Sequence, residues 1–379
     1  MNIIIDANIA YAEKAFSTLG NSKLVDGRTL TNKDVKDADI LIVRSITAVN
    51  EQLLKNSKVR FVGTATIGTD HIDINYLKNQ NIAFVDAKGC NADSVAEYVF
   101  TALLKVASEK KLSLKDKIIG VVGIGNIGSR VIRLANSLGM KVLKNDPPLK
   151  RKGIGDNYVD FGEILKADII TFHVPLSFEG GDITFHLINE RNLKEIKGGT
   201  IIINSSRGAV IDNAALSTES SKKDFELVLD VWEDEPSVNT KLLTKTKIAT
   251  PHIAGYSFEG KVNGTKIIYD ALCKILNTKS SWQLEMPTIE NKEVRLPDGR
   301  TEEEKLYRLF SSIYNLEKDD ELMRKILNYG IIEQPGYFDL MRKKYPVRRE
   351  FSNYTINISE SEIRLKSILE NFRFKVKMN

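Results

Sequence analysis

The sequence predicts an α/β protein with two doubly wound parallel sheets (Rossmann-like or flavodoxin-like) and a small C-terminal α+β domain. Over the first 255 residues, short runs rich in Ile and Val alternate with longer helical patterns, which is the order of βαβ units. The runs are continuously apolar rather than alternating, as expected for strands that helices cover on both faces. Beyond about residue 281 the pattern changes, and helix-start motifs follow a charged stretch that contains two prolines.

The strands fall into two series, and each series predicts one sheet. The first series comprises residues 2–6, 39–45, 60–66 and 82–86. The second comprises residues 117–122, 141–146, 168–172, 200–204, 226–231 and 247–250.

Long helical patterns over 94–110 and 258–277 end the two series. If the second helix packs back beside the first, the N-terminal domain is discontinuous and the cofactor-binding domain is inserted into it. We therefore expect a substrate-binding domain formed by residues 1–95 plus 256–280, a cofactor-binding domain over 96–255 and a third domain over 281–379.

The C-terminal region is predicted to be folded. Pro287 and Pro297 bracket a linker. Thr301 with Glu304, and Ser359 with Glu362, have the spacing of capping boxes at helix starts. Residues 372–378 alternate apolar and cationic side chains like a half-exposed strand.

Composition excludes several classes of protein. The 379 residues carry 55 Lys and Arg against 50 Asp and Glu, a net charge of +5 that does not indicate nucleic-acid binding. The two cysteines, Cys90 and Cys273, are far apart, which argues against disulfide and zinc frameworks. Asp6 interrupts the first apolar run, and no stretch is long enough to cross a bilayer. We expect a cytoplasmic protein without a metal.

A G-x-G-x-x-G motif follows the strand at 117–122 and opens a helix. In a dinucleotide-binding turn, Gly123 permits the tight turn, Gly125 lets the backbone approach a pyrophosphate, and Gly128 allows close packing of helix and strand. Glycines also serve ordinary turns, but the next strand ends in Asp146, eighteen residues after Gly128. An acid there accepts hydrogen bonds from ribose hydroxyls and repels a 2′-phosphate. The motif therefore predicts NAD rather than NADP.

Three polar residues follow successive predicted strands: Arg207, Glu235 and His252. A histidine can take the proton of a secondary alcohol, and a neighbouring carboxylate orients its ring and favours the imidazolium. An arginine can hold a carboxylate and polarise a carbonyl. Taken singly, Arg207 could be a surface cation, Glu235 a member of a solvated acidic loop, and His252 a cap at the end of a strand. Together, after a dinucleotide turn, they predict a dehydrogenase.

These motifs, with Asn204–Gly208, Asp230–Pro236 and Pro251–Tyr256, resemble the D-isomer-specific 2-hydroxyacid dehydrogenase family over roughly residues 1–280. The resemblance implies that Arg207, Glu235 and His252 are catalytic, with the histidine as proton donor and acceptor. It also implies the following residues for NAD: Gly123, Gly125, Asn126, Ile127, Gly128, Asp146, Val174, Ser205, Ser206, Asp230 and Gly255.

Other stretches resemble one branch of that family more closely, among them Asp6–Ile9, Gly63–His71, Gly89–Ala92 and residues 252–261. That resemblance extends over essentially the whole chain and implies oxidation of a small phosphorylated 2-hydroxy acid. It implies Ser45, Thr66 and Tyr256 as substrate contacts, and a homodimer formed through the C-terminal domain. For Ser45 and Thr66, helix capping is the ordinary structural alternative.

Two other functions stay open at this stage: a dehydrogenase of another hydroxy acid, such as 3-phosphoglycerate or glyoxylate, and an NAD-sensing regulator without activity. The residues that hold a substrate phosphate are also open. Arg348 and Arg349 form a cationic pair that could reach a neighbouring subunit's cleft, although a solvated surface is the simpler expectation.

Overall fold

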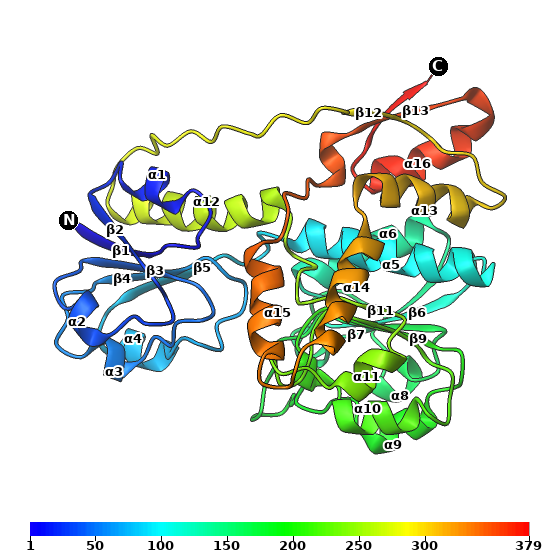
Figure 1. Ribbon diagram of the computed structural model, residues 1–379, viewed down its shortest axis with the longest axis horizontal. Helices are drawn as coiled ribbons and strands as arrows, with labels where there is room; N and C mark the ends of the chain where they lie inside the picture. Colours follow the sequence, from blue (N-terminus) through cyan, green and yellow to red (C-terminus); the bar gives the residue numbers. More distant parts are fainter. Residues whose placement is uncertain (379) are drawn as a thin grey trace. The chain divides into compact units, whose positions relative to one another are not determined.

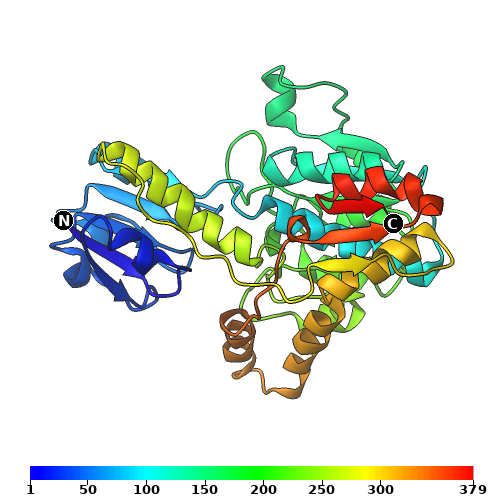
Figure 2. The same ribbon diagram turned by 90° about the horizontal axis from the view of Figure 1, so that it is seen from above.

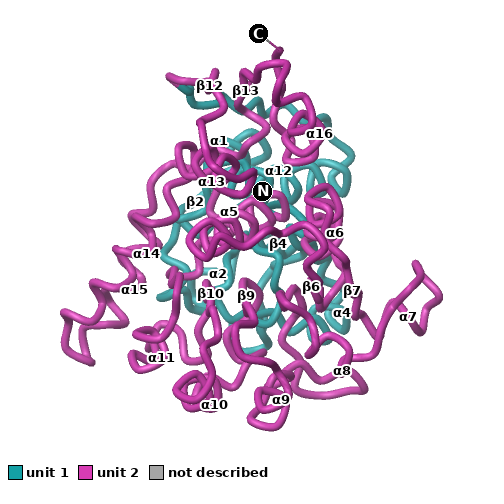
Figure 3. Tube along the Cα trace, turned by 90° about the vertical axis from the view of Figure 1, so that its right-hand side faces the viewer, with its two compact units in different colours: residues 1–91, 258–289 teal, residues 92–257, 290–379 magenta. Residues whose placement is uncertain are grey.

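The computed structural model describes residues 1–378 and divides into two compact units, which Figure 3 colours separately. Unit 1 comprises residues 1–91 and 258–289, and unit 2 comprises residues 92–257 and 290–379. The chain contains two large parallel sheets and a third sheet of three strands, so the predicted fold class is confirmed. No helix among residues 1–378 has the length and apolar character of a membrane span.

Unit 1 is built on a five-stranded parallel sheet with strand order β2-β1-β3-β4-β5. Its strands are β1 (Asn2–Asp6), β2 (Asn21–Val25), β3 (Ile40–Val43), β4 (Phe61–Thr64) and β5 (Ala83–Asp86). The sequence did not predict β2, because this strand lies at the sheet edge and has mostly exposed side chains.

The helices of unit 1 are α1 (Ala12–Phe16), α2 (Asn32–Val35), α3 (Glu51–Leu54), α4 (Ile74–Asn79) and α12 (Phe258–Ile275). In Figure 1, α12 lies beside α1, although about 250 residues separate them in the sequence. The Thr265 hydroxyl donates to the Ala10 carbonyl at 2.6 Å, and the Tyr269 ring meets the Phe16 ring edge to face. Two separate parts of the chain therefore form unit 1.

Unit 2 is built on a six-stranded parallel sheet with strand order β11-β10-β9-β8-β6-β7. Its strands are β6 (Ile118–Val122), β7 (Lys141–Asn145), β8 (Ile169–Phe172), β9 (Ile201–Asn204), β10 (Glu226–Leu229) and β11 (Ile248–Ala249). From β6 the chain proceeds first to β7 on one side and then to β8 on the other. Such a reversal of strand order opens a crevice at the carboxyl ends of the strands.

The helices that belong to this sheet are α5 (Ala92–Lys110), α6 (Asn126–Ser137), α7 (Pro147–Arg151), α8 (Phe161–Ile164), α9 (Glu190–Glu195), α10 (Asn213–Glu219) and α11 (Thr240–Lys245). Helix α5 is buried along most of its length, and its buried residues include the polar Ser94, Glu97 and Thr101.

The C-terminal extension, residues 290–378, belongs to unit 2 and carries its own parallel sheet in the order β12-β13-β14. Its elements are β12 (Glu293–Arg295), α13 (Glu302–Ile313), α14 (Leu316–Arg324), α15 (Gln334–Lys343), β13 (Thr355–Ile358), α16 (Ile363–Asn371) and β14 (Lys375–Met378). Figure 2 shows the red β14 beside α16. Strand β12 lies in the predicted linker, where its exposed, charged side chains gave no strand pattern.

The predicted helix starts form with one variation. The Thr301 hydroxyl accepts a hydrogen bond from the Glu304 amide at 3.1 Å, but the Glu304 carboxylate accepts from the Arg300 amide instead of returning to Thr301. At Ser359 and Glu362 both reciprocal bonds are present, ahead of α16. Local capping therefore fixes both helix starts of the extension.

A buried ionic cluster joins the extension to the large sheet of unit 2. The Arg348 guanidinium donates through Nη2 to the Ala254 carbonyl at 2.6 Å and to the hydroxyl of Ser94 in α5. Glu350 accepts from the Ser257 hydroxyl at 2.9 Å, and Glu97 of α5 accepts from the Phe351 amide at 2.9 Å.

The structure therefore corrects the prediction for Arg348 and Arg349. Their exposed fractions are only 6% and 7%, so they do not form a solvated surface. Charged residues are rarely buried this deeply without compensating groups; Arg348 has hydrogen bonds at Nη2 and the ring of Tyr314, while its Nε and Nη1 have no hydrogen-bond partner among residues 1–378.

Asp319 of α14 belongs to the same buried region, and we expect it to make the free energy of unfolding depend on pH. It accepts a hydrogen bond from the Tyr345 hydroxyl at 2.8 Å, and burial raises its pKa from 3.8 to about 6. Between pH 4 and 6 the unfolded chain loses this proton more readily than the folded chain, so stability falls as the pH rises. A gap of roughly two pKa units corresponds to about 3 kcal/mol. We expect Asp319→Asn to be more stable than the wild-type protein at pH 7 by up to that amount.

Urea unfolding at pH 4 and pH 7 would measure this effect. The difference between Asp319→Asn and the wild-type protein should shrink toward pH 4, whereas Asp298→Asn, at an exposed site, should change little at either pH. A variant less stable than the wild-type protein at pH 7 would contradict the prediction.

Candidate active site

The glycine turn connects β6 to α6, and its three glycines have different physical roles. Gly123 has φ +87°, and a Cβ there would overlap the carbonyl of His173. A Cβ on Gly128 would overlap the carbonyl of Gly123, so the helix could not pack as closely on the turn. At Gly125 a Cβ would meet no atom within 4 Å, so this backbone is open to a ligand. Asn126 and Ile127 form the first turn of α6, where free amides and the helix dipole favour an anion.

Asp146 follows β7 and lies against the glycine turn. One carboxylate oxygen accepts from the Ile124 amide at 2.8 Å, and the other accepts from the Leu149 amide at 3.0 Å, which caps α7. Each carboxylate oxygen can accept a further hydrogen bond, such as one from a ribose hydroxyl.

Two buried polar atoms at the ends of the neighbouring strands have no hydrogen-bond partner among residues 1–378. They are the Ser205 hydroxyl oxygen after β9 and Nδ1 of His173 after β8, next to Val174. Buried polar atoms are nearly always hydrogen-bonded in native proteins, so these atoms fit a crevice that is completed by a bound dinucleotide. Burial also lowers the pKa of His173 to about 3, which keeps this ring neutral.

The position of Asp146 leads to a prediction about cofactor preference. Asp146→Ala removes the charge that would repel a 2′-phosphate, so we expect the preference for NAD over NADP in kcat/KM to fall at least about tenfold. Steady-state rates with both cofactors would measure the ratio. Asp156→Ala, at an exposed aspartate that pairs with Lys144, is the matched control and should leave the ratio unchanged.

Glu235 and His252 form a hydrogen-bonded pair at the ends of β10 and β11. Nδ1 of His252 lies 2.7 Å from Oε2 of Glu235, while Oε1 of Glu235 accepts from the Trp232 amide at 2.9 Å. Burial acts to raise the pKa of Glu235, but the charge and hydrogen bond of His252 and the Trp232 amide outweigh it, so the pKa is lowered. The carboxylate therefore stays ionised and directs Nε2 of His252 away from itself.

The backbone around His252 is held in an uncommon conformation. His252 has φ 57°, in the left-handed region that few non-glycine residues adopt. Buried Asp230 fixes it: its carbonyl accepts from the His252 amide at 2.7 Å, and its carboxylate accepts from the amides of Ile253 and Ala254 at 2.8 and 3.0 Å. Conformations of this kind persist only where several contacts determine them. Gly255 follows in the same turn, which the Tyr256 amide closes onto the Ile253 carbonyl at 2.8 Å.

Arg207 lies in the loop after β9, beside the loop that carries Glu235. The Ser206 amide and hydroxyl both donate to Oδ1 of Asn204, at 3.1 and 2.9 Å, which fixes the turn before Arg207. A Cβ on Gly208 would overlap the backbone of Trp232, so these two loops are in direct contact and only glycine fits. Of the three predicted catalytic residues, the structure joins Glu235 and His252 directly, and Arg207 lies in the loop packed against Trp232.

Ser45 and Thr66 belong to unit 1, and they occupy equivalent places on neighbouring strands. Val43 of β3 and Thr64 of β4 are paired in the sheet, so each hydroxyl residue lies two positions beyond its strand. The Thr66 hydroxyl is 2.8 Å from the Thr64 hydroxyl. Neither residue caps a helix, since Asn50 and Asp73 cap the helices that follow. The alternative of helix capping is therefore wrong for both.

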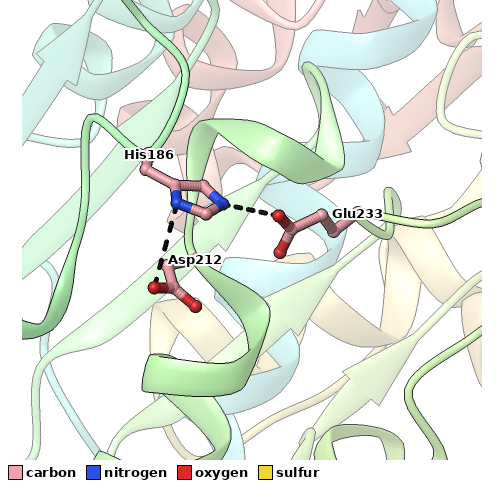
Figure 4. Close-up of side chains that lie close together, drawn as sticks. All are labelled: His186, Asp212 and Glu233. Carbon is pink, nitrogen blue, oxygen red and sulfur yellow. Dashed lines mark hydrogen bonds and ion pairs between the residues drawn. The ribbon is translucent and has the colours of Figure 1, made fainter.

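A second histidine lies close to the Glu235 loop and was not recognised from the sequence. His186 stands between two carboxylates: its Nε2 is 2.5 Å from Glu233, and its Nδ1 is 3.9 Å from Asp212 (Figure 4). The second oxygen of Glu233 accepts from the Asn213 amide at 2.9 Å. These residues line a hollow of about 240 Å³. Glu233 is hydrogen-bonded to both His186 and the Asn213 amide, which holds the loop before Glu235, while Asp212 faces the other ring nitrogen at ion-pair distance only.

Comparison with known proteins identifies the family. Residues 100–254 match the model of the D-isomer specific 2-hydroxyacid dehydrogenase, NAD binding domain, and residues 286–369 match a domain of unknown function. The chain therefore contains an NAD-binding domain. A D-lactate dehydrogenase from Aquifex aeolicus, solved with NAD and lactic acid, has a TM-score of 0.61 and 27% identity, and the match covers 73% of this chain and 96% of that one.

Two relatives match along nearly their whole length, and both are erythronate-4-phosphate dehydrogenases. The protein from Proteus mirabilis is 45% identical over 362 residues, which are 94% of each chain. The protein from Psychromonas ingrahamii is 43% identical over 376 residues, which are 97% of this chain and 96% of that one. The chain belongs to the erythronate-4-phosphate dehydrogenase family, within the D-isomer-specific 2-hydroxyacid dehydrogenases.

Proposed function

We propose that this chain oxidises 4-phospho-D-erythronate at C2 to (3R)-3-hydroxy-2-oxo-4-phosphooxybutanoate with NAD, a step in pyridoxal 5′-phosphate synthesis. The observation that carries the proposal is the hydrogen-bonded Glu235–His252 pair next to the Arg207 loop, in an NAD-binding domain. The names of the full-length relatives support the choice of substrate.

The chemistry follows from the two ends of the His252 ring. Nε2 accepts the proton of the C2 hydroxyl as the C2–O bond becomes a carbonyl, and it returns the proton in the reverse reaction. Glu235, ionised and bonded to Nδ1, stabilises the imidazolium that forms. When bound, NAD supplies the acceptor for the hydride that leaves C2. The guanidinium of Arg207 holds the substrate carboxylate and stabilises negative charge on the C2 oxygen.

Further residues complete the proposed site. Tyr256, four residues after His252, and the hydroxyls of Ser45 and Thr66 contact the substrate. The glycine turn, Asp146, Val174, Ser205, Ser206, Asp230 and Gly255 bind NAD, some of them through the backbone, since the Asp230 carboxylate is already bonded to Thr250, Ile253 and Ala254.

A substrate panel followed at 340 nm tests the proposal. We expect NADH formation with 4-phospho-D-erythronate and little with D-lactate, glycerate or 3-phosphoglycerate. Equal rates on acids without a phosphate would contradict the proposed substrate and would indicate a dehydrogenase of another 2-hydroxy acid. NAD binding without turnover of any acid would favour a regulator.

We also propose a cytoplasmic homodimer formed through the C-terminal extension. Cys90 and Cys273 are both buried and form no disulfide among the described residues, which suits a reducing compartment. Ile331 and Ile332, just before α15, have exposed fractions of 83% and 91%, together with exposed Leu327 and Tyr329. Exposed apolar groups of this kind mark interaction surfaces. Replacing both isoleucines with glutamate should shift the mass measured by light scattering from dimer to monomer, and an unchanged dimer would place the interface elsewhere.

A further inference from the structure

Arg342, near the end of α15, is a cation that the extension brings to the catalytic loop of unit 2. Its Cζ lies 5.6 Å from the centre of the Tyr256 ring, and the Tyr345 ring meets the same ring edge to face at 5.8 Å. Tyr256 belongs to the turn that follows His252. The end of α15 therefore reaches the loop that carries the proposed base.

The buried cluster fixes this placement. Arg348, six residues after Arg342, is bonded to the Ala254 carbonyl, and its backbone pairs with Ser257 in an isolated bridge. Tyr345 is bonded to buried Asp319 at 2.8 Å. Arg348 thus attaches the segment that carries Arg342 to residues on both sides of Tyr256. The position of the Arg342 guanidinium is therefore fixed by packing, unlike that of an exposed side chain.

No direct ion pair compensates the charge of Arg342 among the described residues. Its Nε is buried and has no hydrogen-bond partner among them. The side chain is hydrogen-bonded to Tyr256, and the Glu235 and Asp339 carboxylates act on it only through their charge. Burial acts to lower the pKa of Arg342, but the Tyr256 hydroxyl and the more distant Glu235 carboxylate raise it, so the group stays charged. Glu235 itself is already bonded to His252 and Trp232. A guanidinium beside this loop whose buried Nε donor has no acceptor among residues 1–378 fits an anionic ligand.

We propose that Arg342, together with Tyr256, forms the subsite that binds the phosphate group of the substrate. This inference rests on the proposed function, in which the substrate is anionic at both ends. Arg207 takes the carboxylate, so a second cation is required for the phosphate. A guanidinium offers paired donors that match phosphate oxygens. Arg342 lies in the domain of unknown function, at 286–369, and the subsite gives that domain a role in substrate recognition.

Steady-state kinetics with Arg342→Gln and Arg342→Lys test the subsite. With 4-phospho-D-erythronate we expect Arg342→Gln to raise KM about 10- to 150-fold, the range for a lost charged hydrogen bond, with a smaller change in kcat. Arg342→Lys should recover part of the loss. Inorganic phosphate should inhibit the wild-type enzyme competitively and the Arg342→Gln enzyme much less. Lys343→Gln, at the exposed neighbour on α15, is the matched control and should behave like the wild-type enzyme.

The outcomes separate the subsite from other roles of Arg342. Wild-type KM and wild-type inhibition by phosphate in Arg342→Gln would refute the subsite. A fall in kcat without a rise in KM, together with a shifted pH profile, would also refute it and would make Arg342 a positioning residue for Glu235. A wild-type enzyme that does not oxidise 4-phospho-D-erythronate would refute the proposed function itself, whereas an active wild-type enzyme with an unaffected variant would refute the subsite alone.

Discussion

His252→Ala should lower kcat by roughly 10²–10⁴, the usual contribution of a general acid–base group. The variant loses the nitrogen that we propose accepts the substrate proton, and Glu235 loses the partner that lies 2.7 Å from it in the wild-type protein. The rest of the loop should stay in place, because Asp230 holds it through the backbone amides of residues 253 and 254 rather than through the imidazole. We therefore expect NADH to bind nearly as well as to the wild-type enzyme.

Rapid-mixing and steady-state assays at 340 nm, with NADH binding followed by fluorescence, would measure both quantities. His186→Ala is the comparison variant: this histidine pairs with Glu233 of the same loop but has no part in the proposed proton transfer, so its loss should lower kcat far less than His252→Ala. Near-normal turnover in His252→Ala would show that the base is another residue. Glu235→Gln should have a smaller effect, and combining it with His252→Ala should add little, because the two residues act as one unit.

Arg348→Met should be the most destabilising substitution among these, with a loss of about 3–5 kcal/mol in the free energy of unfolding. The side chain is 6% exposed, its guanidinium lies 4.2 Å from the centre of the Tyr314 ring, and it donates to Ser94 and Ala254. Methionine fills much of the space but removes the charged donor of the cluster, so the Ala254 carbonyl keeps only the Ser94 hydroxyl and the Ser94 oxygen keeps only the Ser257 amide. It also leaves the nearby negative charges without their cation, which is the costly way to break a buried ionic cluster.

Chemical denaturation monitored by circular dichroism would measure the loss. Arg364→Met is the matched control: that arginine pairs with Glu302 at an exposed site, and its replacement should cost less than about 1 kcal/mol. Equal stability of the two variants would contradict the prediction. Because Ala254 is two residues from His252, Arg348→Met should also reduce turnover in the fraction that stays folded.

The parts of the fold that the sequence predicted are those with a local physical cause. Strands such as β6 and β9 are buried on both faces, so their runs of Ile and Val are uninterrupted. The sequence did not predict strands β2 and β12, because their side chains are mostly exposed and they pair with strands that are distant in the sequence. The contact between Glu235 and His252 was predictable because parallel strands bring their carboxyl ends to one edge of a sheet.

The contacts that the C-terminal extension makes with the rest of unit 2 could not be predicted from local sequence patterns. Arg348 and Arg349 have the sequence of a solvated cationic pair, and only the packing of the extension against α5 shows that they are buried. Arg342 lies in a stretch, Phe338–Lys343, that indicated only the family resemblance of the extension, and its place beside Tyr256 depends on how α15 docks. His186 lies in a polar stretch without a periodic pattern, and its bridge to Glu233 joins residues 47 positions apart. Such contacts arise from tertiary packing, which a single sequence does not record.

The attachment of Arg348 to Ala254 and of Glu350 to Ser257 has a genetic consequence. A nonsense codon anywhere between those for residues 290 and 348 would remove the side chains that brace the catalytic turn, although every residue of the NAD-binding domain would still be translated. Such an allele should behave as a complete loss of function, and suppression by tRNA readthrough should restore enzyme activity in proportion to the full-length product.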